Sequence, residues 1–155
     1  MVLDQIFSKE TIIVHLESTE KEELFAEMVE VLHTAHPELV REEAVSALLA
    51  REEKMSTGIL PSVAFPHAFC PSLKNTIGAI GISQDGVDFD ALDKKPVHLV
   101  FMLLAAPGQS GKHVQVLKVL STVLESPDII TKLLQCTSPA DVHTVLRSAE
   151  SAIRQ

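Results

Sequence analysis

The chain has 155 residues, which is long enough to bury a hydrophobic core without disulfides or a structural metal. Its formal net charge of −8 argues against binding to nucleic acid or to an anionic membrane surface, because both require clustered Lys and Arg side chains. The two cysteines fit a reducing compartment, and there is neither a signal peptide nor an apolar run of about 20 residues that could span a bilayer. We therefore expect one cytoplasmic domain over residues 1–155 that is not embedded in a membrane.

The first part of the chain is predicted to form one strand followed by two helices. Residues 11–16, TIIVHL, are rich in β-branched side chains and are typical of a strand. Thr19 and Glu22 match a capping box at the start of the first helix, whose apolar side chains then follow helical spacing. The second helix has its apolar side chains on one face and is expected to end near Glu53.

The middle of the chain is predicted to be built from strands. Residues 63–66 form a short strand, and residues 76–83 alternate between the two faces of a sheet up to a turn at Asp85 and Gly86. Residues 97–106 are nearly all apolar, which is typical of a central strand covered on both faces.

Three helices are expected to complete the chain. One begins near Gly111, and the other two begin at residues 126–127 and 138–139, where Ser suits the N-cap and Pro suits the first helical position. Helices before and after the strands predict an α/β fold, in which helices pack on both faces of a small mixed sheet of parallel and antiparallel strands.

Residues 105–114, AAPGQSGKHV, combine a strand end, a Gly-rich turn and a Gly-Lys pair before a helix, as a phosphate-cradling P-loop does. However, Ala106 occupies the place of the first glycine, and His113 occupies the place of the Ser or Thr that would hold magnesium. We therefore exclude an ATPase. The backbone amides at this helix N-terminus still form an anion site, and His113 lies in its first turn.

His67 lies directly behind Pro66, within the apolar stretch SVAFPHAFCPS of residues 62–72. One interpretation is a core histidine with a satisfied hydrogen bond. The other is a functional group, because imidazole titrates near neutrality and is a competent nucleophile or base. Arg51 and Ser56 lie upstream, where a guanidinium fork and a hydroxyl can bind phosphate oxygens. The alternative for Arg51 is a helix cap that pairs with a nearby Glu.

Two other sets of residues are weak candidates for chemistry. Cys70 beside His67 lacks an orienting acid and is followed at once by Pro71, so we expect a small buried side chain. His33 and His36 are too few for a zinc site, and no further ligands cluster near them. We expect neither a cofactor nor a metal.

Arg51, residues 56–58 (STG) and residues 63–68 (VAFPHA) together resemble the active-site signature of the enzyme IIA domains of the bacterial phosphotransferase system. The resemblance is to the fructose/mannitol class, which includes the nitrogen-regulatory IIA proteins. It continues through residues 86–107 to the helix that carries His113, so it covers almost the whole chain.

The resemblance implies a phosphohistidine carrier that needs no cofactor. His67 would accept a phosphoryl group from the carrier protein HPr or from its nitrogen-branch counterpart. His113 and Arg51 would flank the phosphorylated nitrogen, and Ser56 would bring a hydroxyl near it. Residues 59–62 (ILPS) depart from the Gly-Asn-Gly-like turn that is common in the family.

Two downstream roles share this chemistry. The first is a free-standing nitrogen-regulatory IIA that controls a partner protein, which we expect because the chain has no fused IIB or IIC segment. The second is a sugar-specific (fructose/mannitol) IIA component that passes phosphate to a IIB domain. A third possibility is a non-catalytic binding module on the same fold. That module would have little reason to retain Arg51, Ser56, His67 and His113 together.

Overall fold

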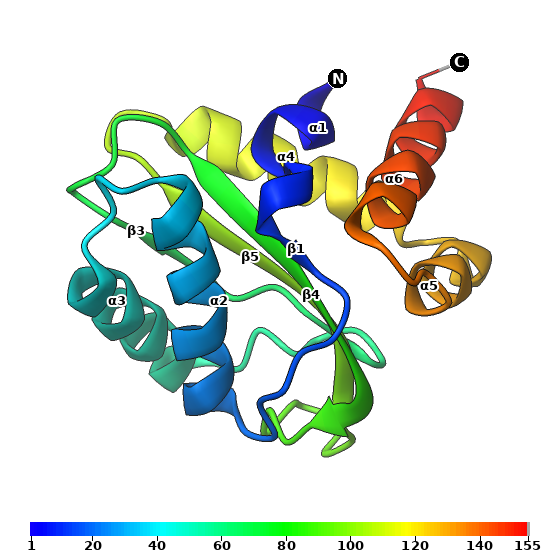
Figure 1. The fold of residues 1–155 in the computed structure, drawn as a ribbon, viewed down its shortest axis with the longest axis horizontal. Helices are drawn as coiled ribbons and strands as arrows, with labels where there is room; N and C mark the ends of the chain where they lie inside the picture. Colours follow the sequence, from blue (N-terminus) through cyan, green and yellow to red (C-terminus); the bar gives the residue numbers. More distant parts are fainter. Residues whose placement is uncertain (155) are drawn as a thin grey trace.

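Five strands form one mixed sheet at the centre of the molecule (Figure 1). In this computed structural model, which describes residues 1–154, they are β1 (Ile12–Ile13), β2 (Val63–Ala64), β3 (His67–Phe69), β4 (Ile77–Val87) and β5 (Val97–Ala105). β5 pairs antiparallel with β4 on one side and parallel with β2 and β3 on the other. β1 pairs parallel with β4. The predicted mixed sheet and the central position of β5 are both confirmed.

Helices cover both faces of this sheet (Figure 1). One face carries α2 (Lys21–Ala35) and α3 (Arg41–Lys54). The other face carries α1 (Val2–Ile6), α4 (Ser110–Val123), α5 (Pro127–Leu134) and α6 (Pro139–Ile153), and the 3-10 turn η1 (Lys9–Thr11) leads into β1. Within residues 1–154, none of the helices has the length and apolar character needed to cross a membrane.

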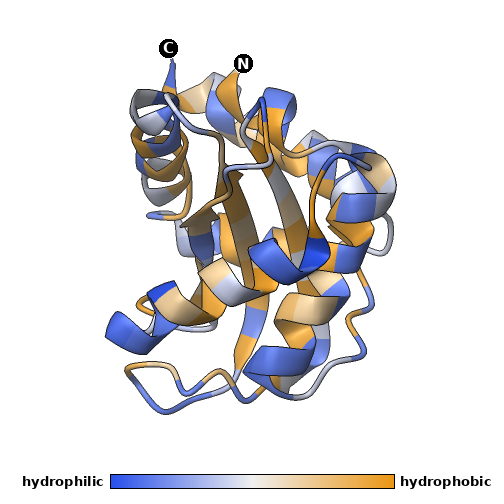
Figure 2. Cartoon of the chain, turned by 90° about the vertical axis from the view of Figure 1, so that its left-hand side faces the viewer, coloured by the Kyte–Doolittle hydropathy of each residue, from blue (hydrophilic) through white to orange (hydrophobic). Residues whose placement is uncertain are grey.

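The side chains of β5 divide between two hydrophobic cores. Leu99 and Phe101 belong to the core beneath α1, α4 and α6, whereas Val100 and Met102 belong to the core beneath α2 and α3. This alternation follows from the two-residue period of a strand, and it explains why β5 is apolar almost throughout. Figure 2 shows the hydrophobic strands enclosed by helices with many hydrophilic outer positions.

The capping box predicted for α2 is wrong. Glu20 is the N-cap and makes no side-chain capping bond, and the hydroxyl of Thr19 instead lies 3.4 Å from a carboxylate oxygen of Glu23. The reason lies in the backbone. Glu20 is extended and pairs with Asp88, whose N–H donates to the carbonyl of Thr19 at 2.8 Å. This pairing delays the start of the helix by one residue, so that Glu22 lies in the first turn, where the helix dipole favours negative charge.

The strand predicted over residues 63–66 is interrupted by Pro66. β2 ends at Ala64 and β3 begins at His67, and both pair with β5. Pro66 has no N–H to give to a ladder, and the N–H of Phe65 donates instead to the carbonyl of Thr57 at 3.1 Å. The break therefore ties the segment before His67 to the turn at residue 57.

Two other predicted strand limits are also wrong. The strand expected over residues 11–16 is reduced to Ile12–Ile13. β4 does not turn at Asp85 and Gly86 but continues to Val87, with a register irregularity that the positive φ of Gly86 (91°) accommodates. The connection to β5 follows later, over residues 88–96.

The C-terminal helices begin where the sequence predicts. Pro127 and Pro139 occupy the first helical positions, and Ser126 and Ser138 are the N-caps. Only Ser138 caps with its side chain, whose hydroxyl accepts the N–H of Asp141 at 3.2 Å.

Candidate functional site

His67 is the first residue of β3, and a hydrogen bond to a backbone carbonyl two residues earlier fixes the state of its ring. Nδ1 lies 2.7 Å from the carbonyl oxygen of Phe65. A carbonyl oxygen only accepts, so Nδ1 carries the proton and donates it. Nε2 is then the nitrogen with the free lone pair. Pro66, between the two partners, restricts the backbone on which the ring is held.

The surroundings of His67 favour its neutral form. Burial lowers the pKa of His67, the bond to the carbonyl of Phe65 partly opposes this shift, and the positive charge of Arg51 lowers the pKa further. The imidazole is therefore unprotonated at Nε2 at neutral pH, which is the state that a nucleophile requires.

His113 lies beside His67 in the opening turn of α4. The two ring centroids are 5.1 Å apart, and the ring of Phe69 lies 5.4 Å from that of His113 on another side. His113 is buried, and within the described part of the chain its Nδ1 has no hydrogen-bond partner. Burial, and secondarily the neighbouring His67, lower the pKa of His113. The site thus holds two adjacent neutral imidazoles.

Within residues 1–154, Arg51 forms the helix cap considered for it from the sequence, without the ion pair to a Glu. One guanidinium nitrogen, Nη1, donates to the carbonyl of Met55 at 2.9 Å and so caps the end of α3. Among the described residues Arg51 forms no ion pair with a Glu. Because a guanidinium has five N–H donors, most of its donors remain available to an anion beside His67. Ser56 lies in the following turn, where its hydroxyl accepts the N–H of Gly58 at 3.1 Å.

Two hollows meet at His67 and Arg51. The first, which we call the apolar pocket, has a volume of about 400 Å³ and also contains Ser56. Its wall includes Ile59 and Leu60, from the ILPS stretch that departs from the family pattern. The second, which we call the histidine pocket, has a similar volume of about 400 Å³ and contains His113, Phe69 and Lys54. All four predicted site residues therefore gather around one imidazole.

Cys70 follows the site but takes no part in it. Its side chain is fully buried, and burial raises the pKa of its thiol to about 11. The interpretation of Cys70 as a small buried side chain is confirmed, because such a thiol is almost entirely protonated at neutral pH.

The sequence interpretation missed a buried ionic cluster beneath the site. Glu52, the residue after Arg51, is buried, and its carboxylate accepts the N–H and the hydroxyl of Thr57 at 2.9 and 2.7 Å. Lys21 of α2 completes the cluster at 3.0 Å from the same carboxylate. One signal was present in the sequence. Glu52 follows Ala44 at two helical turns on the core-facing side of α3, where a charged residue requires an explanation.

The comparisons with known proteins agree with this fold. The family described as "Phosphoenolpyruvate-dependent sugar phosphotransferase system, EIIA 2" matches residues 5–149. Over 138 residues the chain is 41% identical to the fructose-specific EIIABC component of Bacillus subtilis, an alignment that covers 89% of this chain and 22% of that protein. Nitrogen regulatory protein IIA-Ntr from Neisseria meningitidis is similar in structure, with a TM-score of 0.86 and 31% identity over 94% of this chain and 99% of that one.

A further solved structure shares the fold. It is the complex of enzyme IIAMTL and phosphorylated enzyme IIBMTL from Escherichia coli, with a TM-score of 0.78 and 24% identity over 92% of this chain and 99% of that one. The α/β sheet with helices on both faces is thus the fold of IIA proteins. The family match is more specific: the chain belongs to the type 2 EIIA family of the phosphoenolpyruvate-dependent sugar phosphotransferase system.

Proposed function

We propose that this protein is a phosphohistidine carrier, which accepts a phosphoryl group on Nε2 of His67 from an HPr-like phosphocarrier protein. The observation that supports this most directly is the hydrogen bond from Nδ1 of His67 to the carbonyl of Phe65. It keeps the proton on Nδ1 and leaves Nε2 as an unprotonated nucleophile in a pocket that also contains Arg51.

In the proposed transfer, the lone pair of Nε2 forms a bond to phosphorus while the bond between phosphorus and the donor atom breaks. The electron pair of the broken bond stays with the donor, and the proton on Nδ1 of His67 stays in its bond to Phe65. No water takes part, because the phosphoryl group passes directly between the two proteins. Catalysis of this kind depends on positioning and on stabilising the charge of the equatorial oxygens.

Arg51, His113 and Ser56 are the groups proposed to stabilise that charge. Arg51 has free N–H donors beside His67, and a neutral imidazole at His113 has one N–H to offer. The hydroxyl of Ser56 lines the same pocket as His67. Arg51 is the only one of these groups with a full positive charge, and a moderate set of donors suits a carrier, because the phosphoryl group has to leave again.

We also propose that the protein partners dock over the exposed apolar side chains that surround the site. Met55, Ile59, Phe69 and Val114 are each more than half exposed, at 53%, 54%, 54% and 62%. Large apolar side chains gathered around a nucleophile are typical of an interaction surface. Phe69→Ser should slow transfer from HPr without loss of the fold, and unchanged kinetics would exclude Phe69 from this surface.

Two downstream roles are supported by different observations. A regulatory role, in which the phosphorylation state controls a partner protein, is supported by the near-complete overlap with a nitrogen regulatory IIA protein. A sugar-specific role, in which a IIB domain receives the phosphoryl group, is supported by the higher identity to a fructose-specific component. Both are proposed to act in the cytoplasm, where the two free cysteines stay reduced.

The test is the intact mass of the protein after incubation with phosphoenolpyruvate, enzyme I and HPr. Wild type should gain one acid-labile phosphoryl group of about 80 Da, and His67→Ala should gain none. His98→Ala is the matched control, because Nδ1 of His98 also lies 2.9 Å from a backbone carbonyl, that of Ser83, but His98 lies at the start of β5, whereas His67 pairs with Leu103 near the other end of that strand. His98→Ala should be phosphorylated normally.

If wild type gains no mass with any HPr type, the carrier function fails, and the protein is a binding module on the IIA fold. If it does gain mass, transfer to a IIB domain separates the two downstream roles. Rapid transfer of the phosphoryl group to a fructose-type IIB domain would support the sugar-specific role.

A further inference from the structure

A chain of hydrogen-bonded residues leads to His67 from the core-facing side of α3. Glu52 accepts both donors of Thr57, the carbonyl of Thr57 accepts the N–H of Phe65 at 3.1 Å, and the carbonyl of Phe65 accepts Nδ1 of His67. Four residues thus connect a buried carboxylate to the ring that is proposed to be phosphorylated. The successive bonds are joined through the Cα atoms of Thr57 and Phe65, so the chain passes on the position of one residue to the next.

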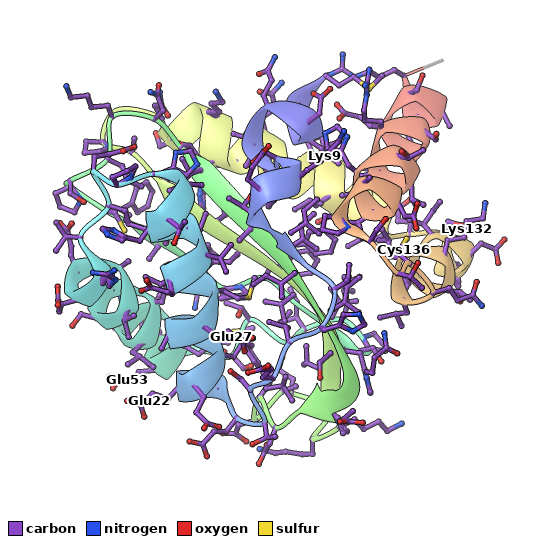
Figure 3. All side chains as sticks on the ribbon, viewed as in Figure 1. Lys9, Glu22, Glu27, Glu53, Lys132 and Cys136 are labelled. Atoms are coloured by element: carbon purple, nitrogen blue, oxygen red, sulfur yellow. The ribbon has the colours of Figure 1, made fainter. Side chains whose placement is uncertain are left out.

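Glu52 is the first residue of this chain, and its carboxylate is buried and ion-paired. The side chain of Glu52 is only 4% exposed, and Lys21 lies 3.0 Å from one of its oxygens. The ammonium of Lys21 also lies 4.5 Å from the ring centroid of Phe89, so it too is held in place. In contrast Glu53, the next residue, is exposed, and Figure 3 shows it at the outer edge of α3.

Stability alone does not explain a charge in this position. Burying a carboxylate and an ammonium costs desolvation that their attraction roughly offsets, and an apolar pair of the same volume is often equally stable. What the carboxylate adds is geometry. The two carboxylate oxygens accept the N–H and the hydroxyl of Thr57 at the same time, so both the backbone position and the side-chain rotamer of Thr57 are fixed. Thr57 in turn sets the peptide of Phe65, whose ring is stacked on Phe101 at 5.9 Å.

On the basis of the proposed function, we propose that Glu52 is a positioning residue for phosphoryl transfer. Acting through Thr57 and Phe65, it orients the imidazole of His67 and keeps its proton on Nδ1. It does not touch the phosphoryl group or the docking partner. Its loss should therefore lower the transfer rate without weakening the binding of the phosphorylated donor.

The experiment compares Glu52→Gln, Thr57→Val and Thr57→Ser with wild type in the full chain. The imidazole ¹⁵N spectrum of the unphosphorylated protein reports the tautomer of His67. The rate of phosphoryl transfer, measured at several concentrations of phosphorylated HPr, reports kcat and KM. Thr57→Val keeps the shape of the side chain but removes one of the two donors to Glu52, so it tests the chain even if Glu52→Gln folds poorly. Thr57→Ser keeps the hydroxyl.

Glu150→Gln is the matched control, because Glu150 is also buried and also accepts two donors, at 2.8 and 2.9 Å, but it lies on α6 and its donors are in the first turn of α1. Glu52→Gln should mix the two tautomers of His67 and lower kcat by about 10-fold to 100-fold at nearly constant KM, because small displacements of a nucleophile have effects of this size. Thr57→Val should show a smaller change in the same direction, and Thr57→Ser should restore both readouts. Glu150→Gln should lose stability but keep the tautomer and the rate.

A wild-type tautomer and rate in both Glu52→Gln and Thr57→Val would overturn the proposal and leave Glu52 as a purely structural group. Equal rate losses in Glu52→Gln and Glu150→Gln would overturn it as well, since the effect would then follow stability alone. If wild type itself accepts no phosphoryl group, the proposed function fails. The ¹⁵N spectra would still decide whether Glu52 controls the ring of His67.

Discussion

Two buried glutamates, on helices that cover opposite faces of the sheet, bind their neighbours with the same chemistry. Glu52 binds the N–H and hydroxyl of Thr57 and pairs with Lys21, a cluster that we call the site support. Glu150 binds the N–H groups of Val2 and Leu3 and pairs with Arg154, a cluster that we call the terminal clamp. Burial, the number of donors and the presence of a cation do not distinguish the two.

The difference lies in what each carboxylate is connected to. The terminal clamp supplies α6 oxygens to the first turn of α1, a five-residue helix that is too short to be stable alone. The site support leads, through two further hydrogen bonds, to the ring of His67. A buried charge is therefore not by itself a mark of function in this fold. The onward connections of its partners separate a structural anchor from a positioning residue.

The largest stability effect is expected at the terminal clamp. Glu150→Ala leaves the N–H groups of Val2 and Leu3 without their acceptor, and each unsatisfied buried donor costs about 1–3 kcal/mol, so we expect a loss of about 3 kcal/mol. Urea unfolding monitored by circular dichroism would measure it. Arg154→Ala is the control, because its side chain is 53% exposed and such an ion pair contributes under about 1 kcal/mol. Equal losses in the two variants would show that the ion pair, not the backbone capping, stabilises α1.

The next largest effect is expected where α1 packs on β4. A Cβ added at Gly78 would lie 2.5 Å from the ring of Phe7 and 2.9 Å from the side chain of Ile6. Both neighbours are buried, so neither can move away freely. We expect Gly78→Ala to cost about 2 kcal/mol, as overpacked cores do, in the same unfolding measurement. A cost below about 0.5 kcal/mol would mean that α1 is less firmly seated than the terminal clamp implies.

The sequence predicted the fold well where a local pattern and the tertiary structure demand the same thing. The apolar run of β5 is buried on both faces, so its pattern has no competing explanation. Ser138 with Pro139 marks the start of α6 by chemistry that acts within one helical turn. Thr19 carries an equally good local signal, but the pairing of Glu20 with Asp88, far away in the chain, overrides it.

The site was predicted unevenly for the same reason. The resemblance to a family signature identified His67, Arg51, Ser56 and His113. Such a signature groups residues that are close in space although they are far apart in the sequence, which spacing alone does not reveal. Glu52 was missed because its sequence context, REEK, is that of a solvated helix end. Only the folded chain brings Lys21 from α2 to its carboxylate. The tautomer of His67 was likewise beyond the sequence, since it depends on a kink at Pro66 that aims the carbonyl of Phe65 at Nδ1.

A smaller effect of opposite sign is expected in the opening turn of α4, which carries His113. Gly111 lies in the first turn of α4, and a Cβ added there would meet no atom within 4 Å. Alanine is the better helix former and restricts the unfolded chain more, so Gly111→Ala should stabilise the protein by about 0.5 kcal/mol. Paired with Gly78→Ala, this unfolding measurement tests whether the opening turn of α4 is packed more loosely than the contact between α1 and β4. A loss on Gly111→Ala would contradict that contrast.

The smallest effect is expected in the pH dependence of stability, and it should come from the two histidines of the site. The pKa values of His67 and His113 are lowered from the ordinary 6.5 in the folded protein, chiefly by burial. Between the lowered folded values and 6.5 the unfolded chain binds more protons, so stability should rise with pH across that window and level off above it. Replacing both histidines by Gln should flatten this part of the curve, measured by urea unfolding from about pH 5 to about pH 8. Gly78→Ala, which removes no titrating group, should lower the curve without changing its slope. If the double variant keeps the wild-type slope, the two imidazoles are more solvated than their packing implies, and Nε2 of His67 would have no advantage over an exposed histidine as a nucleophile at acidic pH.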